Sequence, residues 1–119
     1  MGVGSIRRFQ SSWVIQANTN CEKKALLLLK LFQKRLNRDI HDFVIHQYSQ
    51  NSGLSIQFTV WISCNRWQDC VKELFCLSQR VSRDWSFSET VNKTAKGDSN
   101  NSHIRGIKDI HWLVTNDLG

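Results

Sequence analysis

Five basic side chains recur between positions 23 and 38, at spacings that would place them on one side of a helix. They are Lys23, Lys30, Lys34, Arg35 and Arg38. Ammonium and guanidinium groups recognise phosphates and carboxylates, so the chemistry they offer is ionic recognition. Lys24 adds a sixth cation, and no acidic residue shares this face. Like charges one turn apart are mutually destabilising, so the face is either a solvated surface or a docking surface for an anionic partner.

A second group with chemical potential comprises two histidines and two aromatic residues in strand-like segments. They are His46, Tyr48, Trp61 and His111. Exposed aromatic rings on a sheet stack nucleotide bases in RNA-binding domains. The same side chains would be buried in a homodimer whose sheets pack face to face. Two histidines on one surface would also serve as general base and acid in a metal-independent ribonuclease. The sequence leaves these three interpretations open.

Sequence patterns typical of metal and cofactor sites are missing. Cys21, Cys64, Cys70 and Cys76 form no C-x-x-C pair, and their spacing matches neither zinc nor iron–sulfur sites. The chain has no H-E-x-x-H or H-x-E motif and no glycine-rich phosphate loop. We therefore expect no metal and no cofactor, and we interpret the cysteines as structural or incidental.

The composition is typical of one cytoplasmic domain. The chain has 119 residues, 40% of them hydrophobic, and a formal net charge of +6. That charge favours an anionic macromolecule, either nucleic acid or an acidic protein, as partner. The sequence contains no apolar run of about 18 residues, the length of a membrane span, and no secretory signal. The absence of proline favours long, unbroken elements and argues against a linker between domains.

Hydrophobic periodicity predicts two helices, over residues 19–38 and 65–83. Thr19 and Glu22 have the spacing of a capping box, which would mark the start of the first helix. The apolar face of this helix comprises Ala25, Leu28, Leu29, Phe32 and Leu36, with Cys21 at its N-terminal end, whereas Leu27 and Leu31 fall within the basic face. The core face of the second helix comprises Trp67, Cys70, Val71, Leu74, Leu77, Ser78 and Val81, and Cys76 points the opposite way.

Strands are predicted where β-branched and aromatic residues alternate with polar ones. The expected strands cover residues 11–17, 42–49, 54–63, 84–89 and 107–116. The third has the strictest alternation, with apolar side chains at every second position from Leu54 to Ile62. Residues 1–10 are interpreted as a flexible arm, and the polar segment 90–105 as a mobile loop. The single domain would then span residues 11–119.

The order of these elements is β-α-β-β-α-(β)-β, the pattern of the ferredoxin-like or split βαβ architecture. We expect an α+β two-layer sandwich with an antiparallel sheet of four to five strands and both helices on one face. The other face would be open. It would carry His46, Tyr48, Trp61 and His111, with Val14, Gln16, Val44, Gln57, Thr59, Leu113 and Thr115.

These features favour a small, non-enzymatic binding protein that engages an anionic partner, with nucleic acid as the leading candidate. The basic helix would bind the partner electrostatically. Trp61 and Tyr48, on the opposite side of the fold, would stack bases or be buried in a homodimer, so one small ligand could not contact both surfaces. The third strand, however, lacks the K/R-G-F/Y-G/A-F-V-x-F/Y signature of RNA-recognition domains. The alternatives are a homodimeric regulatory or protein-inhibitor module that uses the open sheet face and, last, a small ribonuclease.

Overall fold

The computed structural model of the chain describes residues 6–47 and 53–116. It contains two helices and eight strands in these residues. In chain order they are β1 (Arg7–Ala17), α1 (Glu22–Leu36), β2 (His41–Gln47), β3 (Leu54–Cys64), α2 (Trp67–Val81), β4 (Ser82–Arg83), β5 (Ser86–Thr90), β6 (Thr94–Ser99), β7 (Asn101–Ser102) and β8 (Ile107–Thr115).

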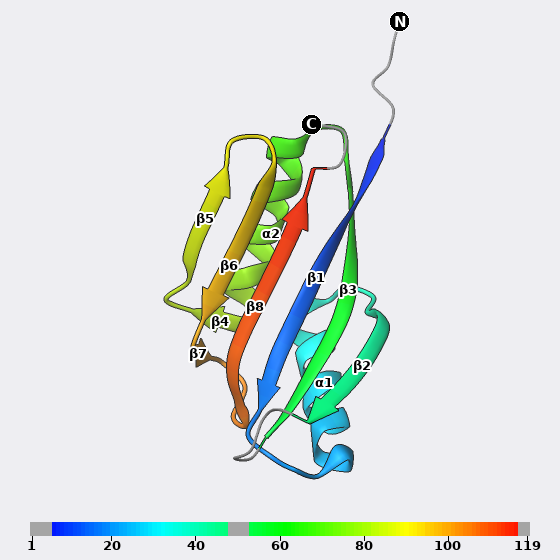
Figure 1. Cartoon of the computed structure of the whole chain (residues 1–119), viewed down its shortest axis with the longest axis vertical. Coiled ribbons are helices and arrows are strands. Elements are labelled where there is room, and N and C mark those ends of the chain that lie inside the picture. The colour runs from blue at the N-terminus through cyan, green and yellow to red at the C-terminus, as the bar shows by residue number, and fades with distance from the viewer. Residues whose placement is uncertain (1–5, 48–52, 117–119) are drawn as a thin grey trace, which may run out of the picture.

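Six of the strands form one antiparallel sheet in the order β2-β3-β1-β8-β6-β5 (Figure 1). The longest strands, β1 and β3, pair over their full length, from Arg7 opposite Cys64 to Ala17 opposite Leu54. The small strands β4 and β7 form a separate two-stranded sheet. The fold is therefore α+β, and its main sheet has more strands than the four or five expected.

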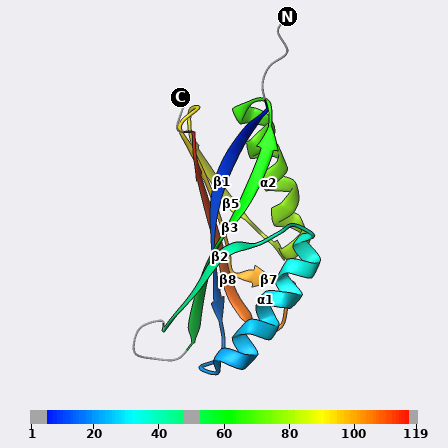
Figure 2. The same cartoon turned by 90° about the vertical axis from the view of Figure 1, so that its right-hand side faces the viewer.

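Both helices lie on one face of the sheet, and the other face is uncovered (Figure 2). In α1 the apolar side chains Ala25, Leu29, Phe32 and Leu36 are buried. The expected capping box is wrong, because the helix begins at Glu22 with Cys21 as its N-cap. The Thr19 hydroxyl instead accepts a hydrogen bond from the Cys21 N–H, at 3.1 Å. Neither helix is long and apolar enough to cross a membrane, as far as the described residues go.

The apolar face of α2 confirms the predicted core stripe at every position. Its buried residues are Trp67, Cys70, Val71, Leu74, Leu77, Ser78 and Val81. The sheet contributes the other half of the core through Ile56, Phe58 and Val60 of β3, which alternate as predicted. Strand alternation would place Phe43 of β2 on the same face as Ile45, but Phe43 is exposed, because a β-bulge between His41 and Val44 shifts the register of this edge strand.

Two tryptophans at the centre of the core, Trp13 of β1 and Trp112 of β8, each hydrogen-bond to a buried serine. The Trp13 indole N–H donates to the Ser11 hydroxyl at 2.9 Å, and the Trp112 N–H donates to the Ser78 hydroxyl at 2.8 Å. Burying an indole N–H without a partner would be costly. These serines therefore let the core take its largest side chains without an unpaired donor.

The expectation of a loop at residues 90–105 is wrong, because Thr94–Ser99 forms β6 within the main sheet. The residues of β6 that face the helices are small, and all three of them are buried: Ala95, Gly97 and Ser99. Gly97 lies opposite Trp112, whose ring occupies the space where a side chain would be. Hydrogen bonds hold β6 in the sheet, and its small residues leave room for the ring of Trp112. Hydrophobic alternation therefore does not reveal this strand.

The N-terminal arm is also shorter than expected, because β1 begins at Arg7 rather than at residue 11. Phe9 explains the extension. Its ring is buried and packs edge-on against Trp67 of α2, with ring centroids 5.8 Å apart. This contact orders the strand up to the first turn of α2. Residues 1–5 lie outside the described part of the chain.

Thiol reactivity should follow burial among the four cysteines. Burial raises the pKa of the Cys70 thiol from 9.0 to about 12 and also raises that of Cys64. Cys21 and Cys76 are exposed. Because alkylating reagents attack thiolates, we expect Cys21 and Cys76 to be labelled first at pH 8, Cys64 later, and Cys70 only on unfolding.

Peptide mapping by mass spectrometry after timed alkylation would measure this order, and labelling in denaturant supplies the reference in which all four react. Cys76 is the internal control for Cys70, since both lie on α2 but on opposite faces. Equal labelling rates for the two in the folded protein would contradict the packing of α2.

Candidate functional site

The outward face of α1 carries Lys23, Lys30 and Lys34, all of them exposed. None of the three forms an ion pair within the residues that the structure describes. Leu27 and Leu31 lie between them, with 58% and 51% of their surface exposed. Exposed leucines flanked by unpaired cations form a surface that is both apolar and positive, and this combination is unusual for a face that only contacts water.

Arg35 and Arg38, predicted to belong to the same anion-binding surface, also bond within the protein. The C-terminal ends of α1 and α2 meet, and Arg35 Nε donates to the Arg80 carbonyl at 3.2 Å. In return, Arg80 Nη1 donates to the Leu36 carbonyl at 2.8 Å. Arg38 forms an ion pair with Glu73 of α2. Arg35 and Arg80 thus bond to carbonyls at the ends of the two helices, and Arg38 is paired with a carboxylate, so the exposed lysines are the better candidates for a partner.

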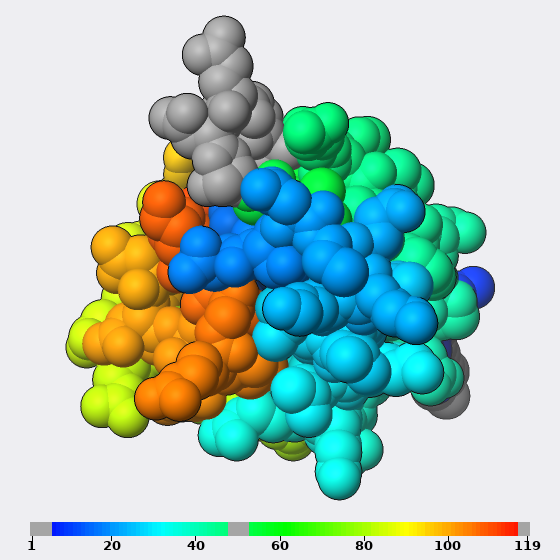
Figure 3. Space-filling model, turned by 90° about the horizontal axis from the view of Figure 1, so that it is seen from below, coloured from blue at the N-terminus to red at the C-terminus, as the bar shows by residue number. Residues whose placement is uncertain are grey.

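A groove runs beside this face of α1, and we call it the α1 groove. Its volume is about 570 Å³, and its lining comprises Leu31, Lys34, Arg35, His103, Ile104 and Arg105. Figure 3 shows the orange segment before β8 beside the cyan α1. Three of the six lining residues are cations, two are aliphatic and none is acidic. The α1 groove therefore joins an apolar floor to a positive rim.

A tight turn holds the second wall of the α1 groove in place. The Ile107 N–H donates to the Ile104 carbonyl at 3.2 Å, and Gly106, third in this turn, has φ of 101°, which favours glycine. Gly106 also packs against Leu28 of α1, so closely that a Cβ would lie 3.0 Å from it. The His103 N–H donates to the Val81 carbonyl at the end of α2. The groove is thus fixed by contacts with both helices.

The residues predicted for the open sheet face do not gather into one site. His46 of β2 and His111 of β8 are separated by β3 and β1, so three strand spacings of about 4.8 Å place them at least about 14 Å apart. Trp61 is half-buried, and the Arg8 guanidinium lies 4.4 Å from its ring centroid. Tyr48 lies outside the described residues. The wide separation gives the two-histidine ribonuclease no geometric support.

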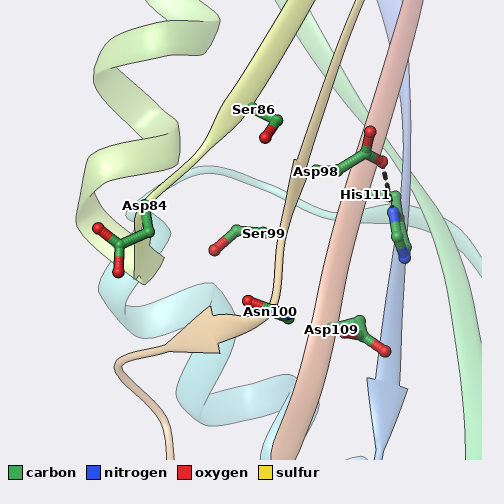
Figure 4. A pocket seen from close by; sticks show the side chains of 7 residues that line it. All are labelled: Asp84, Ser86, Asp98, Ser99, Asn100, Asp109 and His111. Atoms are coloured by element: carbon green, nitrogen blue, oxygen red, sulfur yellow. Dashed lines mark hydrogen bonds and ion pairs between the residues drawn. The ribbon is translucent and has the colours of Figure 1, made fainter.

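His111 takes part in a second, polar hollow at the end of β6. Its Nδ1 lies 2.5 Å from Oδ1 of Asp98, directly across the β6–β8 pair. The hollow has a volume of about 230 Å³ and is lined by Asp84, Ser86, Asp98, Ser99, Asn100, Asp109 and His111 (Figure 4). Asp98 is not among the predicted site residues, because hydrophobic periodicity does not reveal its strand.

This polar hollow lacks the arrangement of a nucleophilic site. A hydroxyl nucleophile would have to bond to the imidazole nitrogen that faces away from the carboxylate. Ser86 instead lies on β5, where it pairs with Asp98 on the side of β6 away from His111 (Figure 4). Over residues 6–47 and 53–116, no three His, Cys, Asp or Glu side chains are grouped as metal ligands. The hollow thus contains one hydrogen-bonded Asp–His pair, and its three aspartates make it opposite in charge to the α1 groove.

Comparison of the chain with protein-family models, with curated proteins and with solved structures found no match.

Proposed function

We propose that the protein is a small, non-enzymatic binding protein that engages an anionic macromolecule through the outward face of α1. The observation that carries the proposal is the set of exposed lysines Lys23, Lys30 and Lys34, unpaired within the described residues, beside a groove with further cations. The net charge of +6 adds long-range attraction. Nucleic acid, an anionic macromolecule of high charge density, is one partner of this class.

Charge reversal on α1 tests this proposal. The variant Lys30→Glu/Lys34→Glu should weaken binding of an anionic macromolecule by at least about tenfold at low salt. Folding should be nearly unaffected, because exposed charges contribute about 0–1 kcal/mol to stability. For a duplex oligonucleotide, the slope of log affinity against log salt should also become shallower by about 0.9 for each phosphate that the variant no longer neutralises. Fluorescence anisotropy at two salt concentrations measures both quantities.

The matched control is Lys72→Glu/Lys96→Glu, which reverses two exposed lysines away from α1, one on α2 and one on β6. Each double variant replaces two positive by two negative charges and so lowers the formal net charge by four, from +6 to +2. Equal weakening in both variants would show that net charge alone attracts the partner. No weakening in either would leave the α1 face a solvated surface and refute the proposal.

We also infer that the four strands β2-β3-β1-β8, with α1 and α2 between them in sequence, correspond to the ferredoxin-like split βαβ arrangement. In this interpretation β6 and β5 extend the sheet beyond β8. The antiparallel pairing of β1 with both β3 and β8 supports it. Because this architecture has many unrelated functions, it adds nothing to the proposal beyond a scaffold. The cytoplasmic location stays a prediction.

A further inference from the structure

We propose that the α1 groove binds an acidic, amphipathic helix of a partner protein. In this complex the apolar side chains of the partner would pack on Leu27, Leu31 and Ile104, and its carboxylates would meet Lys30, Lys34 and Arg105. The inference rests on the proposed function, since it names the chemical class of the anionic partner.

The apolar part of the surface argues for a protein partner over a nucleic acid. Leu31 and Ile104 line the α1 groove, and Leu27 lies one helical turn from Leu31. A phosphate backbone gains nothing from covering leucines, and nucleic-acid surfaces instead pair cations with rings on which bases stack. The six lining residues include no Phe, Tyr or Trp, and the imidazole of His103 is the one ring among them. Aliphatic side chains within a cationic rim are complementary to an amphipathic partner whose polar face is acidic.

The spacing along α1 defines the length of that partner. Leu27 and Leu31 are four residues apart, or about 6 Å along the helix axis at 1.5 Å per residue. A partner helix would match them with apolar side chains at positions i and i+4. Lys23 and Lys34 are eleven residues apart, roughly 16 Å, so carboxylates along about three turns of the partner would reach all the lysines.

The concave shape favours a helix over a flat anionic membrane. Ile104 is itself buried and forms part of the floor, while Arg35 and Arg105 stand on opposite sides, one on α1 and one in the turn before β8. A hollow receives side chains that project from a narrow ligand, whereas a bilayer is best met by side chains that protrude.

The test uses a fluorescently labelled peptide of about 18 residues, five turns of helix. Its leucines lie on one face at helical spacing, and glutamates occupy the other face. A control peptide has the same composition, reordered so that the leucines are spread around the helix. A single-stranded oligonucleotide of similar length and vesicles of anionic lipid complete the set of probes. Anisotropy reports the affinities for the peptides and the oligonucleotide, and co-sedimentation reports binding to vesicles.

The decisive variant is Leu31→Gln, which removes apolar surface without changing charge. We expect it to weaken binding of the amphipathic peptide by about tenfold, while the weaker binding of the reordered peptide stays the same. Leu113→Gln is the matched control, because Leu113 is 48% exposed on the open sheet face, comparable to Leu31 at 51%. It should leave every affinity unchanged. Both variants should fold, since both leucines are exposed.

The outcomes separate this inference from the proposed function. Equal affinity for the two peptides, or an unchanged affinity in Leu31→Gln, overturns the inference. Tighter binding of the oligonucleotide or of vesicles, abolished in Lys30→Glu/Lys34→Glu, overturns it too but leaves an anionic partner at α1. Only if that double variant changes no affinity, or no probe binds, does the proposed function fail as well.

Discussion

Replacing Trp13 with alanine is expected to lower the free energy of unfolding by about 3–5 kcal/mol. The side chain is fully buried on β1, and its ring contacts Phe32 edge-on at 5.8 Å and Trp112 at 6.2 Å between centroids. Alanine would leave a cavity between the sheet and α1 and remove these contacts, together with the stacked contact to Phe58. A domain of this size is stable by only about 5–15 kcal/mol, so Trp13→Ala should be close to unfolded at modest denaturant concentrations.

Trp61→Ala is the control for this prediction. Trp61 lies on the neighbouring strand β3 but is only half-buried on the open face, where Arg8 covers its ring. Its removal should cost about 1–2 kcal/mol, less than the loss of a fully buried ring. Urea titrations followed by circular dichroism measure both changes without relying on tryptophan emission. Similar midpoints for the two variants would show that Trp13 is not the centre of the core.

The variant Gly97→Ala should also destabilise strongly, by about 3 kcal/mol. Glycine to alanine in a strand normally stabilises by several tenths of a kcal/mol, because alanine has less freedom in the unfolded chain. Here a Cβ would lie 2.6 Å from the indole nitrogen of Trp112. That ring cannot move away easily, since its N–H is bonded to Ser78 and Phe87 packs beside it.

The sign of the change makes Gly97→Ala a sharp test of how β6 is placed. Lys96→Ala, one residue earlier, is the control, because Lys96 is exposed on the open face and its replacement should change stability by no more than about 0.5 kcal/mol. Thermal unfolding of the two variants provides the comparison. A Gly97→Ala protein as stable as the parent would mean that β6 does not lie against Trp112.

Sequence periodicity predicted the elements whose burial is one-sided and apolar. The stripe from Trp67 to Val81 and the alternation from Leu54 to Ile62 are buried as expected, because in both cases hydrophobic side chains mark the face. The same reasoning failed for β6, whose buried side chains are Ala95, Gly97 and Ser99. These small and polar residues leave room for Trp112 on the neighbouring strand. The reason for their burial therefore lies in a residue 15 positions from Gly97 in the sequence.

The candidate site was predicted in part for a similar reason. The lysines and leucines of α1 share one face because helical periodicity is local, and the sequence shows it directly. The other wall of the α1 groove, from His103 to Arg105, depends on a turn at Gly106 and on contacts with both helices. Likewise, nothing in the spacing of Arg35 and Arg38 indicates that they would bond to Arg80 and Glu73 of α2.

The strand order leaves β2 and β5 as the two edges of the sheet, which bears on how the protein behaves at high concentration. An unpaired strand edge is a template for intermolecular β-sheet and hence for aggregation. The β5 edge is short and polar, with only Phe87 apolar. The β2 edge exposes Phe43 and Val44, but the bulge after His41, where Asp42 has φ of 54°, interrupts its regular hydrogen-bonding pattern. We therefore expect the bulge at Asp42 to make this more hydrophobic edge a poor template for strand pairing between molecules.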